Sequence, residues 1–531
     1  MILKIRDINI LGDDNYKIMH KDKLICYFRG VFYYRGMMAG EKSIEALFNQ
    51  YTKNKEFDFN NFYGSYHIIF MDEDEDKVIF FTDNAGYCCF YYSGDGEFIS
   101  DSFLELANVF KTISPNYEAI TEFIYFDCIY SNNTICNEIL RTDSMKYYTI
   151  NNFYVVEKVK ELSIWNDVYV YRDMHNFMKD TVASTKDYKT VDIITGGVDS
   201  RTVLSHLESL GVEYDLAISG SESMNDVKIA KQIANRLGKE IHISDEIVIN
   251  ADTQWLKDLF ISTDGVTGIF SHNRLHNKNV MLKKLGFQLE FGGVGGEFYK
   301  NSFLNQDFPF YNGKISRKNF YKLKINTKNF DKKYLTQDIL NYANKMENKI
   351  INELFYNEYG DKSKVYFRVG HKILRYRMVT LSNCNSISIP SLSPFMENDM
   401  LKLTYNKNPW DLEVNKWQRN EVSKYCKEIA NINTDRGLTL SNNKVQIYKE
   451  LFQSYGFLFK VALKRMLHKK DIPVRLDAFI KGRELKEFQM AMNVCKELYI
   501  LSEDCNINDI SDVLADRLMT IGLVYMNFQN G

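Results

Sequence analysis

A glycine turn between a short apolar strand and a helix is the feature of the sequence that most constrains the fold. Residues 191–194 read Val-Asp-Ile-Ile, a run rich in β-branched residues of the kind that parallel sheets bury. Gly196 and Gly197 interrupt this run, and a helix is expected to start at or near Asp199. Backbone N–H groups converge at such a turn and the helix dipole adds partial positive charge, so the turn can hold a phosphate or pyrophosphate group. Asp199 lies next to this turn, where a carboxylate is expected to bind a Mg²⁺ ion that the phosphates share.

Residues 195–200, Thr-Gly-Gly-Val-Asp-Ser, resemble the Ser-Gly-Gly-x-Asp-Ser pyrophosphate loop of the N-type ATP pyrophosphatases. In particular, they resemble the loop in the synthetase domain of the asparagine synthetase-like family. The resemblance implies ATP and Mg²⁺ as cofactors. The residues that would hold the pyrophosphate are Thr195, Gly196, Gly197, Asp199 and Ser200. The alternative is a Gly-Gly turn that only joins a strand to a helix and binds no nucleotide.

The segment after this loop alternates strands and helices. A second strand is expected at residues 214–218, an amphipathic helix at residues 226–237 that ends at Gly238, and a third strand at residues 240–243. This alternation predicts a doubly wound parallel sheet, with the ligand at the carboxyl ends of its strands. In the resembled family a Ser/Gly loop near adenine follows the second strand, which makes Ser219 a candidate ATP-binding residue.

A second glycine loop, residues 292–299, reads Gly-Gly-Val-Gly-Gly-Glu-Phe-Tyr and resembles the family's Ser-Gly-Glu-Gly-x-Asp-Glu loop. The resemblance implies that Gly293 lies near the pyrophosphate. It also places Glu297 on the position of an aspartate that shares Mg²⁺ with Asp199, and glutamate is likewise a hard oxygen ligand. The alternative is a glycine-rich strand end with a solvated carboxylate. Val294 departs from the family at a position near the reacting amine, because valine can neither take nor polarise a proton, so asparagine synthesis itself is not expected.

The first 160 residues alternate short apolar strands with polar turns, which predicts a layered α+β domain built on antiparallel sheets. Residues 64–71 and 82–92 resemble segments of the amino-terminal class II glutamine amidotransferase domain of the same family. The family's nucleophile is a cysteine that becomes amino-terminal when methionine is removed, whereas residue 2 here is Ile2. The nearest thiol, Cys26, is expected inside a strand. We therefore expect a degenerate amidotransferase-like domain without glutaminase activity.

Residues 435–437, Asp-Arg-Gly, stand where the resembled family has Arg-x-Lys-x-Gly. Arg436 is therefore a candidate to neutralise the leaving pyrophosphate, and it joins Asp199 and Glu297 as a candidate catalytic residue. The resemblance implies a degenerate amidotransferase-like domain at 1–160 and an ATP pyrophosphatase domain of the adenine nucleotide alpha hydrolase-like type at 161–440, and the helical pattern of the remaining residues predicts an extension at 441–531.

Charge and composition limit the partners of the chain. The formal net charge is −2 and the pI is about 6.5, so nucleic acid is not expected as a partner. No apolar run approaches the ~18 residues that span a bilayer, so no membrane partner is expected either. Nine cysteines without CxxC spacing indicate reduced thiols, and no signal peptide is visible, so a cytoplasmic location is expected.

The resemblance implies an ATP-dependent, AMP-forming carbon–nitrogen ligase that adenylates a substrate carboxylate and then forms an amide. The expected partners are a small-molecule or peptide carboxylate and an amine nucleophile, together with a precursor peptide or pathway protein if the product is a natural product. Lasso-peptide cyclases and β-lactam synthetases are family members of this kind. Three alternatives stay open: amidation of a sugar carboxylate in surface-polysaccharide synthesis, adenylation-dependent sulfur transfer with Cys384 as the candidate thiol, and a non-catalytic scaffold.

Overall fold

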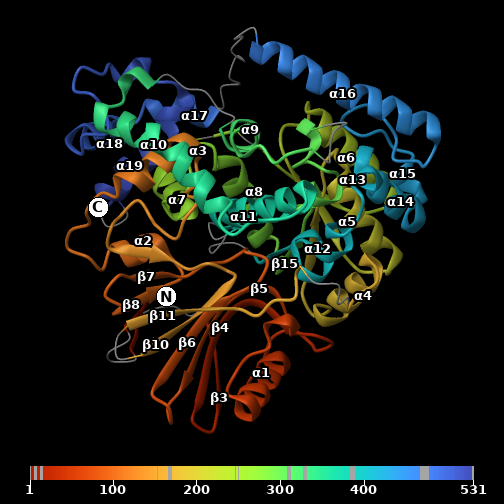
Figure 1. The fold of residues 1–531 in the computed structure, drawn as a ribbon, viewed down its shortest axis with the longest axis horizontal. Helices are drawn as coiled ribbons and strands as arrows, with labels where there is room; N and C mark the ends of the chain where they lie inside the picture. Colours follow the sequence, from red (N-terminus) through yellow and green to blue (C-terminus); the bar gives the residue numbers. More distant parts are fainter. Residues whose placement is uncertain are drawn as a thin grey trace.

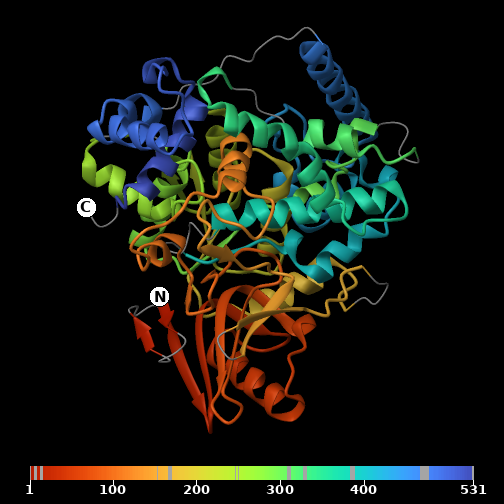
Figure 2. The same ribbon diagram turned by 60° about the vertical axis from the view of Figure 1, so that its left-hand side comes forward.

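Two kinds of β-sheet divide the protein into two parts in the computed structural model (Figures 1 and 2). The amino-terminal part, drawn in red and orange, contains two antiparallel sheets, and the next part contains one parallel sheet with helices around it. The predicted class, α/β with an amino-terminal α+β part, is confirmed. The structure describes residues 2–4, 9–11, 16–151, 154–165, 170–245, 247–248, 250–307, 313–326, 332–382, 389–466 and 477–528.

The two antiparallel sheets pack face to face. Apolar side chains of both sheets, such as Leu3, Phe80 and Ile99, are buried between them. Helix α1 (Glu41–Asn54) covers the other face of the larger sheet with a second apolar cluster. The smaller sheet has the order β2 (Asn9–Leu11), β1 (Ile2–Lys4), β8 (Phe98–Ser100), β7 (Tyr91–Ser93) and β9 (Ile139–Arg141). The larger sheet has the order β11 (Tyr154–Val159), β10 (Lys146–Asn151), β6 (Lys77–Thr82), β5 (Phe62–Asp72), β4 (Leu24–Tyr34) and β3 (Lys17–Lys21).

The parallel sheet is doubly wound, as the strand and helix alternation predicts. Its order is β14 (Ile241–Ser244), β13 (Asp215–Ser219), β12 (Thr190–Ile193), β15 (Leu289–Phe291) and β16 (Ser391–Leu392), with every neighbouring pair parallel. The chain runs outward from β12 to β14 on one side and returns to β15 and β16 on the other. Because the direction of winding changes at β12, the switch point where such sheets bind ligands lies between β12 and β15.

Helices cover both faces of the parallel sheet. On one face, apolar residues of α5 (Val198–Ser209) and α6 (Asn225–Leu237) pack against the strands. On the other face, Leu282 of α8 (Asn273–Lys284) packs against Val191 and other strand residues. None of the described helices has the length and hydropathy that a bilayer crossing requires.

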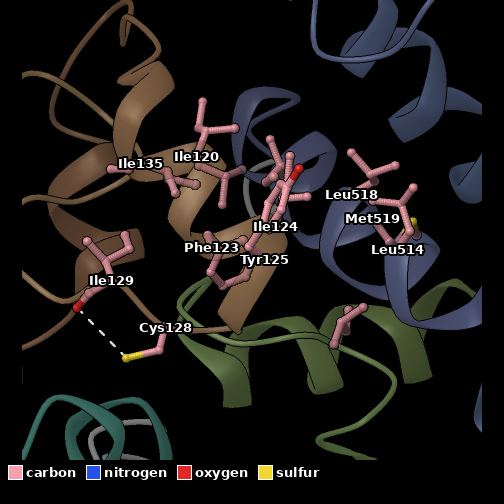
Figure 3. Packing of buried hydrophobic residues seen from close by; sticks show 14 of the residues in the cluster. Ile120, Phe123, Ile124, Tyr125, Cys128, Ile129, Ile135, Leu514, Leu518 and Met519 are labelled. Atoms are coloured by element: carbon pink, nitrogen blue, oxygen red, sulfur yellow. Dashed lines mark hydrogen bonds between the residues drawn. The ribbon is translucent and has the colours of Figure 1, made fainter. Parts of the chain in front are cut away.

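The carboxyl-terminal helices share a hydrophobic core with a helix from the amino-terminal part. Figure 3 shows Leu514 and Leu518 of α19 (Asp512–Tyr525) beside α3 (Tyr117–Phe126), whose buried residues include Phe123. The predicted helical extension therefore packs on residues that precede it by almost four hundred positions. The same core includes residues of α7 (Thr253–Thr263), α10 (Gln337–Leu354), α11 (Lys362–Ser382), α17 (Asp477–Arg483) and α18 (Lys486–Glu497).

Further helices are α2 (Phe103–Ala107), α4 (Met174–Ser184), α9 (Arg317–Phe320), α12 (Asn398–Tyr405), α13 (Pro409–Leu412), α14 (Lys416–Tyr425), α15 (Lys427–Ala430) and α16 (Lys444–Met466).

Asp516 connects α19 to the loop that precedes α8. One oxygen of its buried carboxylate accepts hydrogen bonds from the backbone N–H groups of Phe270, at 2.6 Å, and Ser271, at 3.4 Å. Burial, together with the nearby carboxylate of Asp127, raises the pKa of Asp516 to about 7. A group with this pKa couples the packing of α19 to the pH.

The substitution Asp516→Asn is expected to change how stability depends on pH. Because the folded-state pKa lies above the ordinary value of 3.8, the folded protein keeps this proton to a higher pH than the unfolded chain does. The associated stability is therefore present below about pH 4 and is lost as the pH rises through about 7. Asparagine keeps the oxygen acceptor for Phe270 without the charge, so its contribution does not change with pH. The melting temperature of the variant minus that of the wild type should therefore be about 2 °C larger at pH 8 than at pH 5. Scanning calorimetry at both pH values checks this, and a constant difference would contradict the assigned pKa.

Candidate functional site

The first glycine loop lies at the carboxyl end of β12, the central strand of the parallel sheet. The Thr195 N–H donates to Ser200 Oγ at 3.1 Å, and Thr195 Oγ1 accepts from the Gly197 N–H at 3.2 Å. These bonds fold the loop into a turn directly before α5. Gly197 is the N-cap of α5 and offers no side chain to cap the helix, so the amino-terminal N–H groups of α5 are left for an anion.

The second glycine loop packs directly on the first. A Cβ atom added at Gly293 would lie 2.6 Å from the backbone nitrogen of Ser200, and one added at Gly296 would lie 2.3 Å from Cγ of Asp199. Such distances are shorter than van der Waals contact, so the two loops can approach only because both positions are glycine. The carboxyl ends of β12 and β15 thereby meet at the switch point, with Asp199 between the loops.

A cavity of about 290 Å³ opens beside Asp199. One carboxylate oxygen of Asp199, Oδ2, lies 2.5 Å from Nζ of Lys300, and the other, Oδ1, accepts a 2.5 Å hydrogen bond from Nε2 of Gln418. Both partners are absent from the site expected from the sequence, although the position of Lys300 directly after the second glycine loop is a signal for it. The cavity is lined by Gly197, Val198, Asp199, Lys300, Ser302, Asn305, Glu413, Val414, Asn415, Thr434, Asp435, Arg436, Leu440, Glu450 and Tyr455.

Two buried arginines hold the walls of this cavity in place. Arg201, on α5, donates to the backbone carbonyls of Ile432 and Asn433 at 2.7 Å each, and burial lowers its pKa to about 10. Arg419, on α14, donates to the carbonyl of Thr439 at 2.7 Å and pairs with Glu450 of α16. The segment that contains Arg436 is thus fixed to α5 and α14 by charge-assisted hydrogen bonds.

The backbone of the cavity wall is strained at one position. Val414 has φ 48° and ψ 40°, and the next residue, Asn415, also has a positive φ of 57°. Asparagine adopts this conformation readily, but a β-branched residue does so rarely and at a cost of about 1–3 kcal/mol. Both residues line the cavity, so the strain is located at the candidate site.

The structure brings some of the predicted site residues together and separates others. Asp199 and Arg436 line the same cavity, as does Gly197. Glu297 lies on a short 3-10 turn (Gly296–Tyr299) and does not line it; its Oε2 atom is buried without a hydrogen-bond partner among the described residues. The charge of Glu297 instead interacts with that of Arg377 on α11.

Ser219 lies at the end of β13, next to the strand that carries the first loop. Its hydroxyl accepts a 2.9 Å hydrogen bond from Ser244, and its carbonyl accepts one from Arg274. Ser219 is not among the residues that line the cavity. The position at the carboxyl edge of the sheet is nevertheless the one expected for a residue near a nucleoside.

The cavity lining offers groups for both phosphate and a metal ion: two cationic side chains, Lys300 and Arg436, and four carboxylates, Asp199, Glu413, Asp435 and Glu450. The uncapped amino terminus of α5, Lys300 and Arg436 all suit phosphate oxygens. For Mg²⁺, Asp199 is a suitable oxygen ligand in the cavity, and Glu297 would have to turn towards it.

The thiols of the described residues are buried and poor nucleophiles. Ile2 lies in β1, and Cys26 is fully buried in β4. Burial raises the pKa of all eight described cysteines, to about 12 for Cys89. A thiol with a raised pKa forms little thiolate at neutral pH. Cys384, the candidate for sulfur transfer, lies outside the described residues.

Comparison of the sequence with models of known protein families found no match, and comparison with curated proteins found none either. The structure establishes a two-part fold of antiparallel α+β sheets followed by a parallel α/β sheet. A function must therefore be inferred from the residues and geometry of this chain.

The substitution Gly293→Ala is expected to disrupt the contact between the two glycine loops. The added Cβ would meet the backbone of Asp199 and Ser200 at less than 3 Å, and backbone atoms cannot move aside as a side chain can. We expect a loss of about 1–3 kcal/mol of stability, measured by denaturant unfolding. Gly292→Ala is the matched control, because a Cβ at Gly292 meets nothing within 4 Å. Equal stability of the two variants would contradict the close packing of the loops.

Proposed function

We propose that this protein is an ATP-dependent, AMP-forming carbon–nitrogen ligase of the asparagine synthetase-like type. The observation that carries the proposal is the meeting of two glycine loops at the switch point of the sheet, with the Asp199 carboxylate between them. The cavity beside this carboxylate contains two cationic side chains, Lys300 and Arg436. A site that binds polyphosphate at a helix amino terminus needs these elements.

In the proposed reaction, a substrate carboxylate attacks the α-phosphorus of ATP and pyrophosphate leaves. The hydroxyls of Thr195 and Ser200 and the amino terminus of α5 would hold the pyrophosphate, and Arg436 would neutralise the charge that it gains. Mg²⁺ bound by Asp199, with Glu297 as the second candidate ligand, would supply further neutralisation. The acyl-adenylate then reacts with an amine, which forms the amide and releases AMP.

The amine is proposed to come from a substrate or from free ammonia. Val294 is 43% exposed on the second loop and carries no group that accepts a proton, so the nucleophile must lose its proton to another group. The buried, high-pKa thiols of the amino-terminal part give no support to glutamine hydrolysis. Val294 and the buried thiols together favour an enzyme that joins two groups of its own substrates, as lasso-peptide cyclases and β-lactam synthetases do.

Nucleotide binding is the first test, because it needs no knowledge of the substrate. Wild-type protein is expected to bind an α,β-methylene ATP analogue with Mg²⁺ saturably in a calorimetric titration. Asp199→Asn keeps the oxygen that accepts from Gln418 but removes the charge, and it should weaken binding about tenfold or more.

Asp187→Asn is the matched control, because Asp187 is exposed and lies before β12, outside the cavity. This variant should bind the analogue as the wild type does. Failure of the wild type to bind the analogue would overturn the ligase proposal and favour a non-catalytic scaffold.

A further inference from the structure

We propose that Lys300 is an exchangeable counter-cation of this site. In the nucleotide-free protein it neutralises Asp199, and when metal and nucleotide bind it transfers its ion pair to the pyrophosphate oxygens. This inference rests on the proposed function and adds a residue to its binding site. It starts from the 2.5 Å contact between Lys300 Nζ and Asp199 Oδ2 inside the cavity.

The two oxygens of Asp199 are not equally available. Oδ1 is held by the amide of Gln418, a fully buried side chain on α14, which cannot move without disturbing the packing of that helix on α5. Oδ2 is held by Lys300, whose side chain is 25% exposed. A divalent cation that enters the cavity would therefore take Oδ2 and displace the ammonium group, because two cations cannot share one carboxylate oxygen without strong repulsion.

The backbone at Lys300 is anchored, and its partly exposed side chain lines the cavity. The next residue, Asn301, has a positive φ of 53°, and its amide donates to the carboxylate of Glu413 at 3.0 Å and to the carbonyl of Pro409. The chain direction at Lys300 is thus held by the cavity wall. Its four-carbon stem carries a compact point charge with several rotatable bonds, which suits it to exchange one anion for another.

The cavity offers a destination for the displaced ammonium group. Lys300 and Arg436 line the same space next to the amino terminus of α5, where phosphate oxygens are favoured. Among the described residues, Asp199 is the carboxylate within 4 Å of Lys300 Nζ. When the metal occupies the Asp199 carboxylate, the entering pyrophosphate group would give the ammonium group of Lys300 a new anionic partner.

The test is the variant Lys300→Met, which keeps the length of the side chain and removes the charge. The affinities of this variant for Mn²⁺ and for the ATP analogue should change in opposite directions. Binding of Mn²⁺ alone, followed by electron paramagnetic resonance, should become at least threefold tighter, because the competing cation is gone. Binding of the α,β-methylene ATP analogue at saturating Mg²⁺ should become at least tenfold weaker, because a phosphate partner is lost.

Controls separate this inference from the ligase proposal and from a structural effect. Lys186→Met, at an exposed position outside the cavity, should leave both affinities unchanged. AMP lacks the pyrophosphate group, so its affinity should be equal in wild type and Lys300→Met. Lys300→Arg should recover most of the analogue affinity, and Lys300→Gln, measured in parallel, should repeat both shifts if Lys300→Met does not fold.

The outcomes distinguish the two proposals. If the wild type binds the analogue and Lys300→Met binds it equally well, the role of Lys300 is overturned and the ligase proposal stands. A loss of both Mn²⁺ and analogue affinity in Lys300→Met would show a structural role and would also overturn the exchange. If the wild type does not bind the analogue, both proposals fail together.

Discussion

The site depends on the contact between two glycine loops, of which the second has no side chain where it meets the first. Gly293 and Gly296 bring the second loop against the backbone of Ser200 and the carboxylate of Asp199, at distances that a single methyl group would prevent. This contact joins the ends of β12 and β15 and holds the carboxylate in the wall of the cavity. The arrangement of the parallel sheet, with its change of winding at β12, is what places the two loops next to each other.

Around this contact, buried charges position the remaining walls. Arg201 and Arg419 each bind backbone carbonyls of segments that have no regular structure, and such segments need these bonds to keep one conformation. Glu450 on α16 completes the pairing of Arg419, and α16 is the long helix at the top of Figure 1. A cavity built from arginine-held loops can carry a strained residue such as Val414, because the surroundings determine its backbone.

The amino-terminal part shares a hydrophobic core with the carboxyl-terminal helices. Helix α3 lies in one hydrophobic core with α10 and α19, so the carboxyl-terminal helices stabilise a segment that the sequence assigns to the first domain (Figure 3). Asp516 adds a buried carboxylate to the same junction. Every described cysteine is buried, and the contribution of the amino-terminal part that the structure shows is its packing against the carboxyl-terminal helices.

The sequence by itself determined the order of the elements, because strand and helix periods, glycine turns and helix caps are local properties. It therefore predicted the parallel sheet and the antiparallel part, and the resemblance predicted a shared site for Asp199 and Arg436, which line one cavity. Only the tertiary structure decided that Lys300 and Gln418 hold Asp199, that Glu297 does not line the cavity, and that α19 packs on α3. Most of these contacts join residues that are between about one hundred and four hundred positions apart. The position of Glu297 depends on the short turn Gly296–Tyr299 that carries it. No local pattern encodes which side chain will face which cavity, since that is set by how the packed elements meet.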